Sequence, residues 1–87
     1  MKLSKTNKFK KHYKQRVLEK DDKIFIYVLS RLLKEEELED KFRNHRLIGK
    51  LKDFRGCHLR SDLLLIYQVL DDEVMLVDIG SHSQLFG

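Results

Sequence analysis

The sequence contains no proline and no tryptophan, and it has a single cysteine. One cysteine excludes an internal disulfide, which fits a protein of the reducing cytoplasm, so we expect a cytoplasmic location. No apolar run approaches the ~20 residues that a membrane-spanning helix needs. There is no low-complexity segment and no internal repeat. With 87 residues, the chain is expected to form one domain, residues 1–87, with a modest core.

Lys and Arg are absent from residues 61–87, which carry five acidic groups. They are concentrated in two other segments. Residues 1–20 carry eight Lys or Arg and one Glu, and residues 41–60 carry seven and one Asp. A folded domain with two basic blocks attracts a polyanion such as RNA, or an acidic protein. A solvated lysine-rich surface has the same composition, so charge alone does not decide between these readings.

The spacing of apolar residues predicts an α+β domain. Phe9, Tyr13 and Val17 recur every four residues, and a wide apolar stripe follows Asp22, so we expect a helical hairpin. Both helices would pack on one face of a three-stranded antiparallel meander. The expected elements are a short edge strand at Lys2–Ser4, helices beginning near Thr6 or Asn7 and near Asp21 or Asp22, a loop over residues 35–53 with one helical turn, strands at Phe54–Leu59, Leu63–Leu70 and Val74–Ile79, and a helical turn after Gly80.

The hairpins of the meander predict that polar side chains gather at one end of the sheet. If Asp72 is the centre of the last turn, Asp62 lies opposite His82. The preceding turn places His58 beside Asp62 at the same end, because adjacent strands lie ~4.8 Å apart. His45 lies in the long loop, which we expect to fold over that end.

This cluster matches what cleavage of RNA requires. The 2′-hydroxyl must lose a proton, the leaving 5′-oxygen must gain one, and histidine has a reference pKa near ~6.5 that suits both tasks. Three histidines and one aspartate also suit zinc, although no close pair of ligands supports a metal site. Cys57 and His58 point to opposite faces of a strand, so Cys57 is expected in the core rather than in a thiol–imidazole pair.

Two stretches, NHRLIGKLKDFRGCHLRSDLLLIY (residues 44–67) and GSHSQLFG (residues 80–87), resemble the YafQ-type toxins of the RelE superfamily. The resemblance implies a RelE-like fold and a ribosome-dependent endoribonuclease that cleaves messenger RNA without a metal or other cofactor. It also implies a cognate antitoxin, with operator DNA bound only through the antitoxin complex. The implied catalytic residues are His45, His58, Asp62 and His82, and the implied RNA-binding residues are Lys50, Lys52, Arg55, Arg60 and Phe86. Either His58 or His45 would be the base, with His82 as the acid.

Three departures from the family pattern leave alternatives open. Family members often carry Trp in the region of Leu51 and at the position of Leu63, and some carry Arg where this chain has Asp78. Under strict alternation Asp78 shares a face with Val74 and Leu76, and an acid facing the site would repel phosphate. The alternatives are a ParE-like inhibitor without nuclease activity and a catalytically weak toxin that mainly binds its antitoxin.

Overall fold

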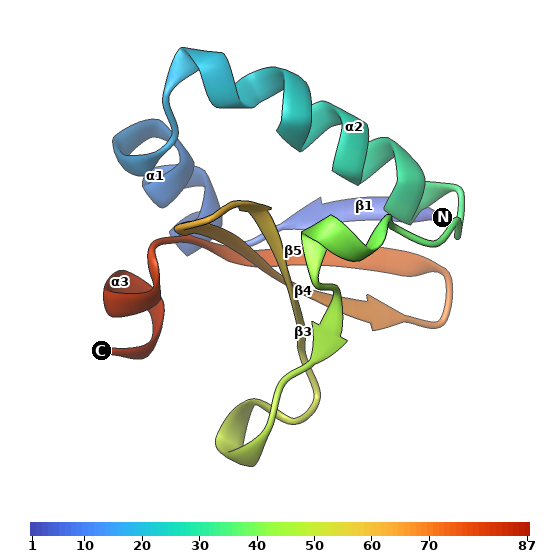
Figure 1. Cartoon of the computed structure of the whole chain (residues 1–87). Helices are drawn as coiled ribbons and strands as arrows, with labels where there is room; N and C mark the ends of the chain where they lie inside the picture. Colours follow the sequence, from blue (N-terminus) through green and yellow to red (C-terminus); the bar gives the residue numbers. More distant parts are fainter.

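The computed structural model describes residues 1–87 and contains a five-stranded mixed sheet in the order β1-β5-β4-β3-β2. The strands are β1 (Lys2–Lys5), β2 (His45–Arg46), β3 (Arg55–Arg60), β4 (Leu63–Leu70) and β5 (Glu73–Gly80). The expected meander of β3, β4 and β5 is confirmed, and β1 is an edge strand that runs parallel to β5 (Figure 1). β2 was not expected, because two residues give no periodic signal.

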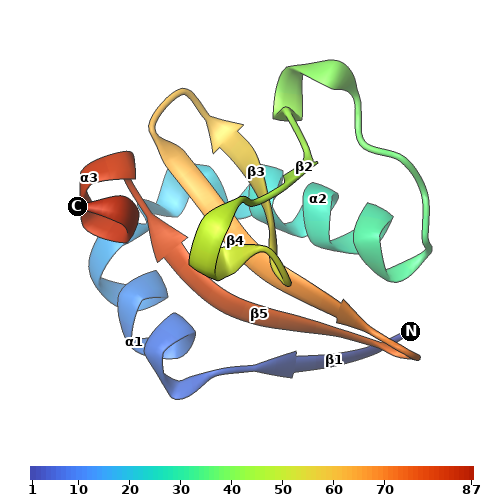
Figure 2. The same ribbon diagram turned by 90° about the horizontal axis from the view of Figure 1, so that it is seen from below.

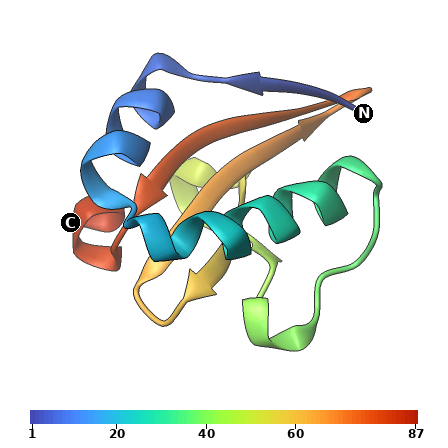
Figure 3. The ribbon, with the colours of Figure 1, turned by 90° about the horizontal axis from the view of Figure 1, so that it is seen from above.

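Helices α1 (Asn7–Arg16) and α2 (Asp22–Leu33) cover one face of the sheet, as predicted (Figures 1 and 3). Thr6 caps α1 by accepting a hydrogen bond from the backbone N–H of Phe9 at 2.9 Å. Short 3-10 turns lie at Glu19–Asp21, Asp40–Phe42 and Gly49–Leu51, and helix α3 (His82–Phe86) follows β5 directly. Figure 2 shows α3 and the connection from β2 to β3 at the surface that α1 and α2 leave open.

The core lies between the helices and the sheet. Phe9 and Phe25 stack against each other with ring centroids 6.0 Å apart, and Leu65 and Tyr67 of β4 meet them from the sheet. All residues of β4 from Leu63 to Tyr67 are buried, as expected for a central strand with both faces covered. The thiol of Cys57 is fully buried in the same core.

A bulge in β5 changes the register between β4 and β5. Leu64 pairs with Gly80, which agrees with the expected alignment of Asp62 and His82, but Tyr67 pairs with Leu76. The extra residue moves Ile79 into the core with Leu76. Asp78 therefore does not share their face, and the expectation from strict alternation was wrong because a bulge shifts every later side chain by one position.

Beyond β1, helix α1 covers the open edge of β5. The hydroxyl of Thr6 donates to the carbonyl of Val77 at 2.7 Å, and Arg16 Nη1 donates to the carbonyl of Ile79 at 3.1 Å. These contacts satisfy carbonyl groups that would otherwise lack a neighbouring strand. They also fix the end of β5 from which α3 begins.

Candidate active site at the end of the meander

Two histidines meet across the middle strand of the meander. His58 lies in β3 opposite Leu64, and His82 is the first residue of α3. β4 separates β3 from β5, the strand that leads into α3, so β3 and β5 are roughly 9.6 Å apart, or two strand spacings. The imidazole rings nevertheless approach to 5.4 Å between centroids. This distance puts both rings within reach of a single phosphate group.

Asp62 holds His82 at this rim. It lies in the turn between β3 and β4, and its Oδ1 accepts a hydrogen bond from the backbone N–H of His82 at 3.1 Å. The same oxygen is 3.6 Å from Nδ1 of the His82 ring. The carboxylate therefore fixes the start of α3 and lies where it can orient the imidazole.

β2 brings His45 to the same face. His45 pairs with Gly56, which lies two residues before His58 and so points to the same side of β3. Its Nδ1 is 2.7 Å from the carbonyl oxygen of Arg43, which fixes the ring. Because Gly56 has no side chain, nothing on β3 stands between His45 and His58. The structure thus brings the three histidines and Asp62 to one rim, with His45 placed by the strand that was not expected.

Phe86 completes this end of the molecule. Its ring lies 6.1 Å from that of His82, centroid to centroid, and the residue is 47% exposed. An aromatic ring that is partly exposed beside an imidazole offers a surface on which a base can stack.

The pKa of His58 is lowered from its usual value. Burial is the largest cause, followed by the positive charges of His82, Arg43 and His45 nearby. A lowered pKa keeps the imidazole of His58 neutral at neutral pH, so it is able to accept a proton. This is the protonation state that a general base requires.

Of the four candidate RNA-binding cations, only Arg60 lines a cleft together with His58, and its charge is already paired. Arg55 pairs with Tyr67 on the helix-covered face of β3, the face opposite to that of His58. Arg60 Nε donates to Asp21 Oδ1 at 3.0 Å and ties the end of β3 to the start of α2. Lys50 and Lys52 are exposed in and after the Gly49–Leu51 turn, and neither lines the cleft beside His58.

Two cations that sequence reasoning did not single out do lie beside His58. Lys41 and Arg43 line a cleft of about 410 Å³ next to His58. Both belong to the basic block of residues 41–60, and Arg43 stands two residues before His45. That spacing was the available signal, but only β2 and the turn before it place Arg43 near β3.

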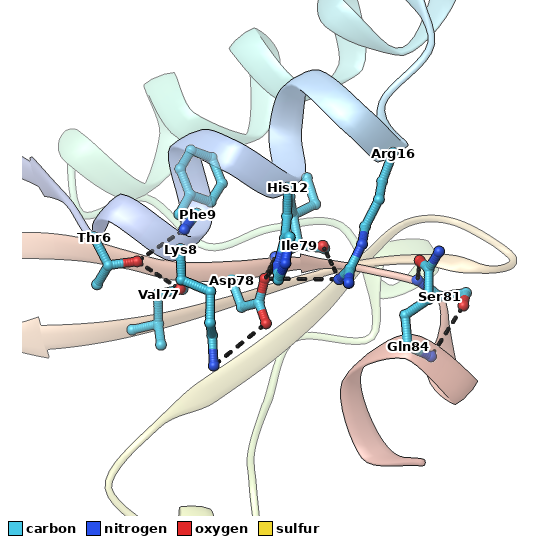
Figure 4. A network of polar contacts seen from close by, with 10 residues as sticks. All are labelled: Thr6, Lys8, Phe9, His12, Arg16, Val77, Asp78, Ile79, Ser81 and Gln84. Atoms are coloured by element: carbon cyan, nitrogen blue, oxygen red, sulfur yellow. Dashed lines mark hydrogen bonds and ion pairs between the residues drawn. The ribbon is translucent and has the colours of Figure 1, made fainter.

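Two of the three departures from the family pattern, Asp78 and Leu63, have a structural account. Asp78 is buried and accepts a hydrogen bond from His12 Nδ1 at 2.6 Å, with Arg16 Nη1 at 3.9 Å (Figure 4). Lys8 Nζ lies 3.6 Å from its other oxygen. The carboxylate is thus directed to α1 and surrounded by cations rather than facing the histidine rim. Leu63 is 2% exposed and belongs to the core.

The thiol and metal alternatives can be judged from the geometry. Burial raises the pKa of the Cys57 thiol to about 12, so it stays protonated and is a poor nucleophile. No group of three or more His, Cys, Asp or Glu side chains is arranged closely enough to hold a metal ion. None of the helices is both long and apolar enough to cross a membrane.

Comparison with known proteins defines the class. The family model described as "Bacterial toxin of type II toxin-antitoxin system, YafQ" matches residues 1–87, so the chain belongs to this family. The chain is 34% identical over 64 residues to a putative toxin YafQ of Haemophilus influenzae, which covers 69% of this chain and 63% of that protein. It is 35% identical over 46 residues to an mRNA interferase toxin YafQ of Escherichia coli, covering 53% and 50%. The aligned regions thus span less than two thirds of either relative.

Solved structures share the whole fold. A copper-bound mutant toxin from Helicobacter pylori is 41% identical, has a TM-score of 0.93 and is matched over 99% of each chain. A chain of the E. coli DinJ–YafQ complex is 24% identical, has a TM-score of 0.84 and is matched over 98% of this chain and 97% of its own. The expected RelE-like α+β architecture is therefore confirmed over the full chain.

Proposed function

We propose that this YafQ-family toxin is an endoribonuclease that cleaves messenger RNA on the translating ribosome by histidine acid–base chemistry. The observation that carries the proposal is the approach of His58 and His82, with Asp62 bound to the start of α3. Family membership and the name of the E. coli relative, an mRNA interferase, support the choice of substrate.

The roles follow from the environments of the two rings. His58, with its lowered pKa, accepts the proton of the 2′-hydroxyl, whose oxygen then attacks the adjacent phosphorus. His82 donates a proton to the leaving 5′-oxygen, and the nearby Asp62 carboxylate orients the donor. The products are a 2′,3′-cyclic phosphate, which hydrolyses to a 3′-phosphate, and a 5′-hydroxyl. The mechanism requires no metal or other cofactor.

His45 and Phe86 position the RNA in this proposal. His45 contacts the phosphate from the β2 side, since it neighbours His58 across Gly56. Phe86 stacks on the base that follows the scissile bond, because it lies beyond His82. The proposed site is a rim of mostly exposed side chains, so the ribosome is expected to supply much of the positioning of the message.

The proposal includes an antitoxin partner. The E. coli relative was solved in complex with DinJ, and this chain offers a surface suited to a partner protein. A groove between α1 and α2 has an apolar floor of Phe9, Tyr13, Phe25 and Ile26, flanked by Lys5, Lys10 and Lys14. Such a groove fits an antitoxin segment with one apolar face and acidic residues beside it.

Mapping the 5′ ends of cellular messages after induction of the toxin tests the proposal. Cuts within translated regions, in frame with the codons, are the expected result. The variant that lacks both His58 and His82 should produce no cuts and no growth arrest. Arrest that persists without both imidazoles would instead indicate a binding mode of inhibition. Cleavage by purified protein and ribosomes should be insensitive to chelation of metal bound to the protein.

A further inference from the structure

A basic cleft lies on the far side of His58 from His82. It has a volume of about 410 Å³ and opens between the start of α2, the Asp40–Phe42 turn and the outer edge of β3. β2 pairs only with Arg55 and Gly56, so no strand covers the edge of β3 beyond Gly56. A cleft of this size falls within the range of ~300–1,000 Å³ that is common for small-ligand sites. We call it the β3-edge cleft.

The charge of the β3-edge cleft is of one sign. Lys41, Arg43 and Arg60 line it together with His58, and no acidic side chain does. Asp21 already binds Arg60, through contacts of 3.0 and 3.4 Å. Neither Lys41 nor Arg43 takes part in an ion pair, and Nζ of Lys41 lies 5.2 Å from the centroid of the Phe42 ring. Cations that share a concave surface repel each other unless an anion lies between them. Two cations without an acidic partner beside His58 therefore suit an anionic ligand.

The backbone around Arg43 is held at a definite position. Arg43 has φ 47° and ψ 46°, in the left-handed region that side chains other than glycine rarely adopt. Its N–H donates to the carbonyl of Asp40 at 3.0 Å, and its own carbonyl is 2.7 Å from Nδ1 of His45. Arg43 thus fixes the His45 ring through its carbonyl and also lines the cleft beside His58.

We propose that the β3-edge cleft binds the phosphate on the 5′ side of the nucleotide whose 2′-hydroxyl is deprotonated, with Arg43 and Lys41 as its ligands. The inference rests on the proposed function, because it takes the polarity of the RNA from the roles of the two histidines. His58 marks the nucleotide that supplies the 2′-hydroxyl, and His82 marks the following one. The strand therefore enters through the β3-edge cleft, passes between the imidazoles and leaves over Phe86.

The test uses a six-nucleotide RNA that is 2′-O-methylated throughout and so cannot be cleaved. Its affinity is measured by fluorescence anisotropy against salt concentration, for the wild type and for Arg43→Ala. The substitution should weaken binding about five- to tenfold at low salt and reduce the slope of log K against log salt by roughly 0.7, the value for one phosphate contact on a single strand. Lys41→Ala should act in the same direction.

Two further variants keep the result interpretable. Arg43→Gly removes the guanidinium but accepts the positive φ without strain, so it separates loss of the ligand from misfolding. Lys2→Ala removes the same charge from β1, at the other end of the sheet (Figure 2), and should change the affinity less than twofold. The side-chain Nε–Hε signal of Arg43 should shift on addition of the RNA, which reports the contact directly.

The outcomes separate this inference from the proposed function. Equal affinity and slope for Arg43→Gly and the wild type, with no shift of the Arg43 signal, would overturn the β3-edge cleft even if messages are still cut. Loss of affinity for an acidic antitoxin segment without loss for RNA would overturn it too. RNA binding that depends on Arg43, in a protein that cuts no message, would support the β3-edge cleft and refute the proposed nuclease activity.

Discussion

Asp78 and Asp62 allow a paired prediction, because one carboxylate is buried in a structural network and the other lies exposed at the rim. The side chain of Asp78 is 10% exposed and that of Asp62 is 63% exposed. Asp78 also accepts the backbone N–H of Ile79 at 2.8 Å. Asp78→Ala should therefore lower the stability of the protein without changing its cleavage rate. Asp62→Ala should lower the cleavage rate with little effect on stability.

The magnitude follows from what each carboxylate contacts. Removing one partner of a buried ion pair typically costs about 3–5 kcal/mol, because the other charge is left without compensation. We take the lower end, about 3 kcal/mol, since Lys8 is 61% exposed and loses little. For a domain of this size that corresponds to a decrease in melting temperature of about 12 °C or more. It is a large share of the total, which for 87 residues is about 4–13 kcal/mol. Asp62→Ala should cost about 0.5 kcal/mol or less.

Thermal unfolding and cleavage are measured on the same preparations. Asp78→Ala, assayed below its melting temperature, should cut RNA at nearly the wild-type rate. Asp62→Ala should be slowed about 10²-fold, with a melting temperature lowered by no more than about 4 °C. Asp78→Asn keeps the shape and an acceptor for Ile79, so it should fall between Asp78→Ala and the wild type in stability. Wild-type melting of Asp78→Ala together with slow cleavage would refute the reasoning, since it would place Asp78 in the active site.

Three further predictions concern single side chains. His82→Ala should lose at least ~10²-fold in cleavage rate with circular dichroism and melting unchanged; an unfolded variant would mean that His82 is structural. Because the pKa of His58 is lowered and its neutral form is the base, kcat/KM should fall with decreasing pH only below the usual histidine range. Arg43→Ala removes a positive charge that lowers this pKa, so the fall in kcat/KM should begin at a higher pH. An NMR titration of His58 should show the same rise in its pKa. Cys57, with a thiol pKa of about 12, should react with iodoacetamide only when the protein unfolds, and labelling of the native protein would contradict its place in the core.

Much of the fold was predictable because its elements carry strong periodic signals. The apolar run of β4 and the acidic turn after it indicated the meander, and the meander in turn aligned Asp62 with His82. The bulge at Val77 had no signal in the sequence, since its cause is the packing of Ile79 into the core and the contact of Asp78 with α1. Strict alternation therefore predicted the wrong face for Asp78, although the register farther along β5 was correct.

The site was less predictable than the fold, because it depends on contacts between segments distant in sequence. Arg60 looked like a ligand for RNA, but its guanidinium binds Asp21, which lies 39 residues earlier in the chain. Arg43 carried no motif, and its place beside His58 depends on a two-residue strand and a residue with positive φ. The count of charges identified the basic segment of residues 41–60. It could not show which of its cations are paired with an acidic side chain and which are not.

Two glycines help the histidines of β2, β3 and α3 to approach one another. Gly56 lies opposite His45, and the side chain of Leu47 packs against it, since a Cβ there would lie 3.2 Å from a methyl carbon of Leu47. Gly80 lies opposite Leu64, and a Cβ there would come within 2.8 Å of both Arg16 Nη1 and Gln84 Oε1. Those two atoms respectively donate to the carbonyl of Ile79 and accept from the N–H of Ser81, so displacing them would loosen both sides of the junction between β5 and α3. The position of His82 thus depends on α1 through Arg16, and the basic N-terminal helix contributes to the proposed active site without touching RNA.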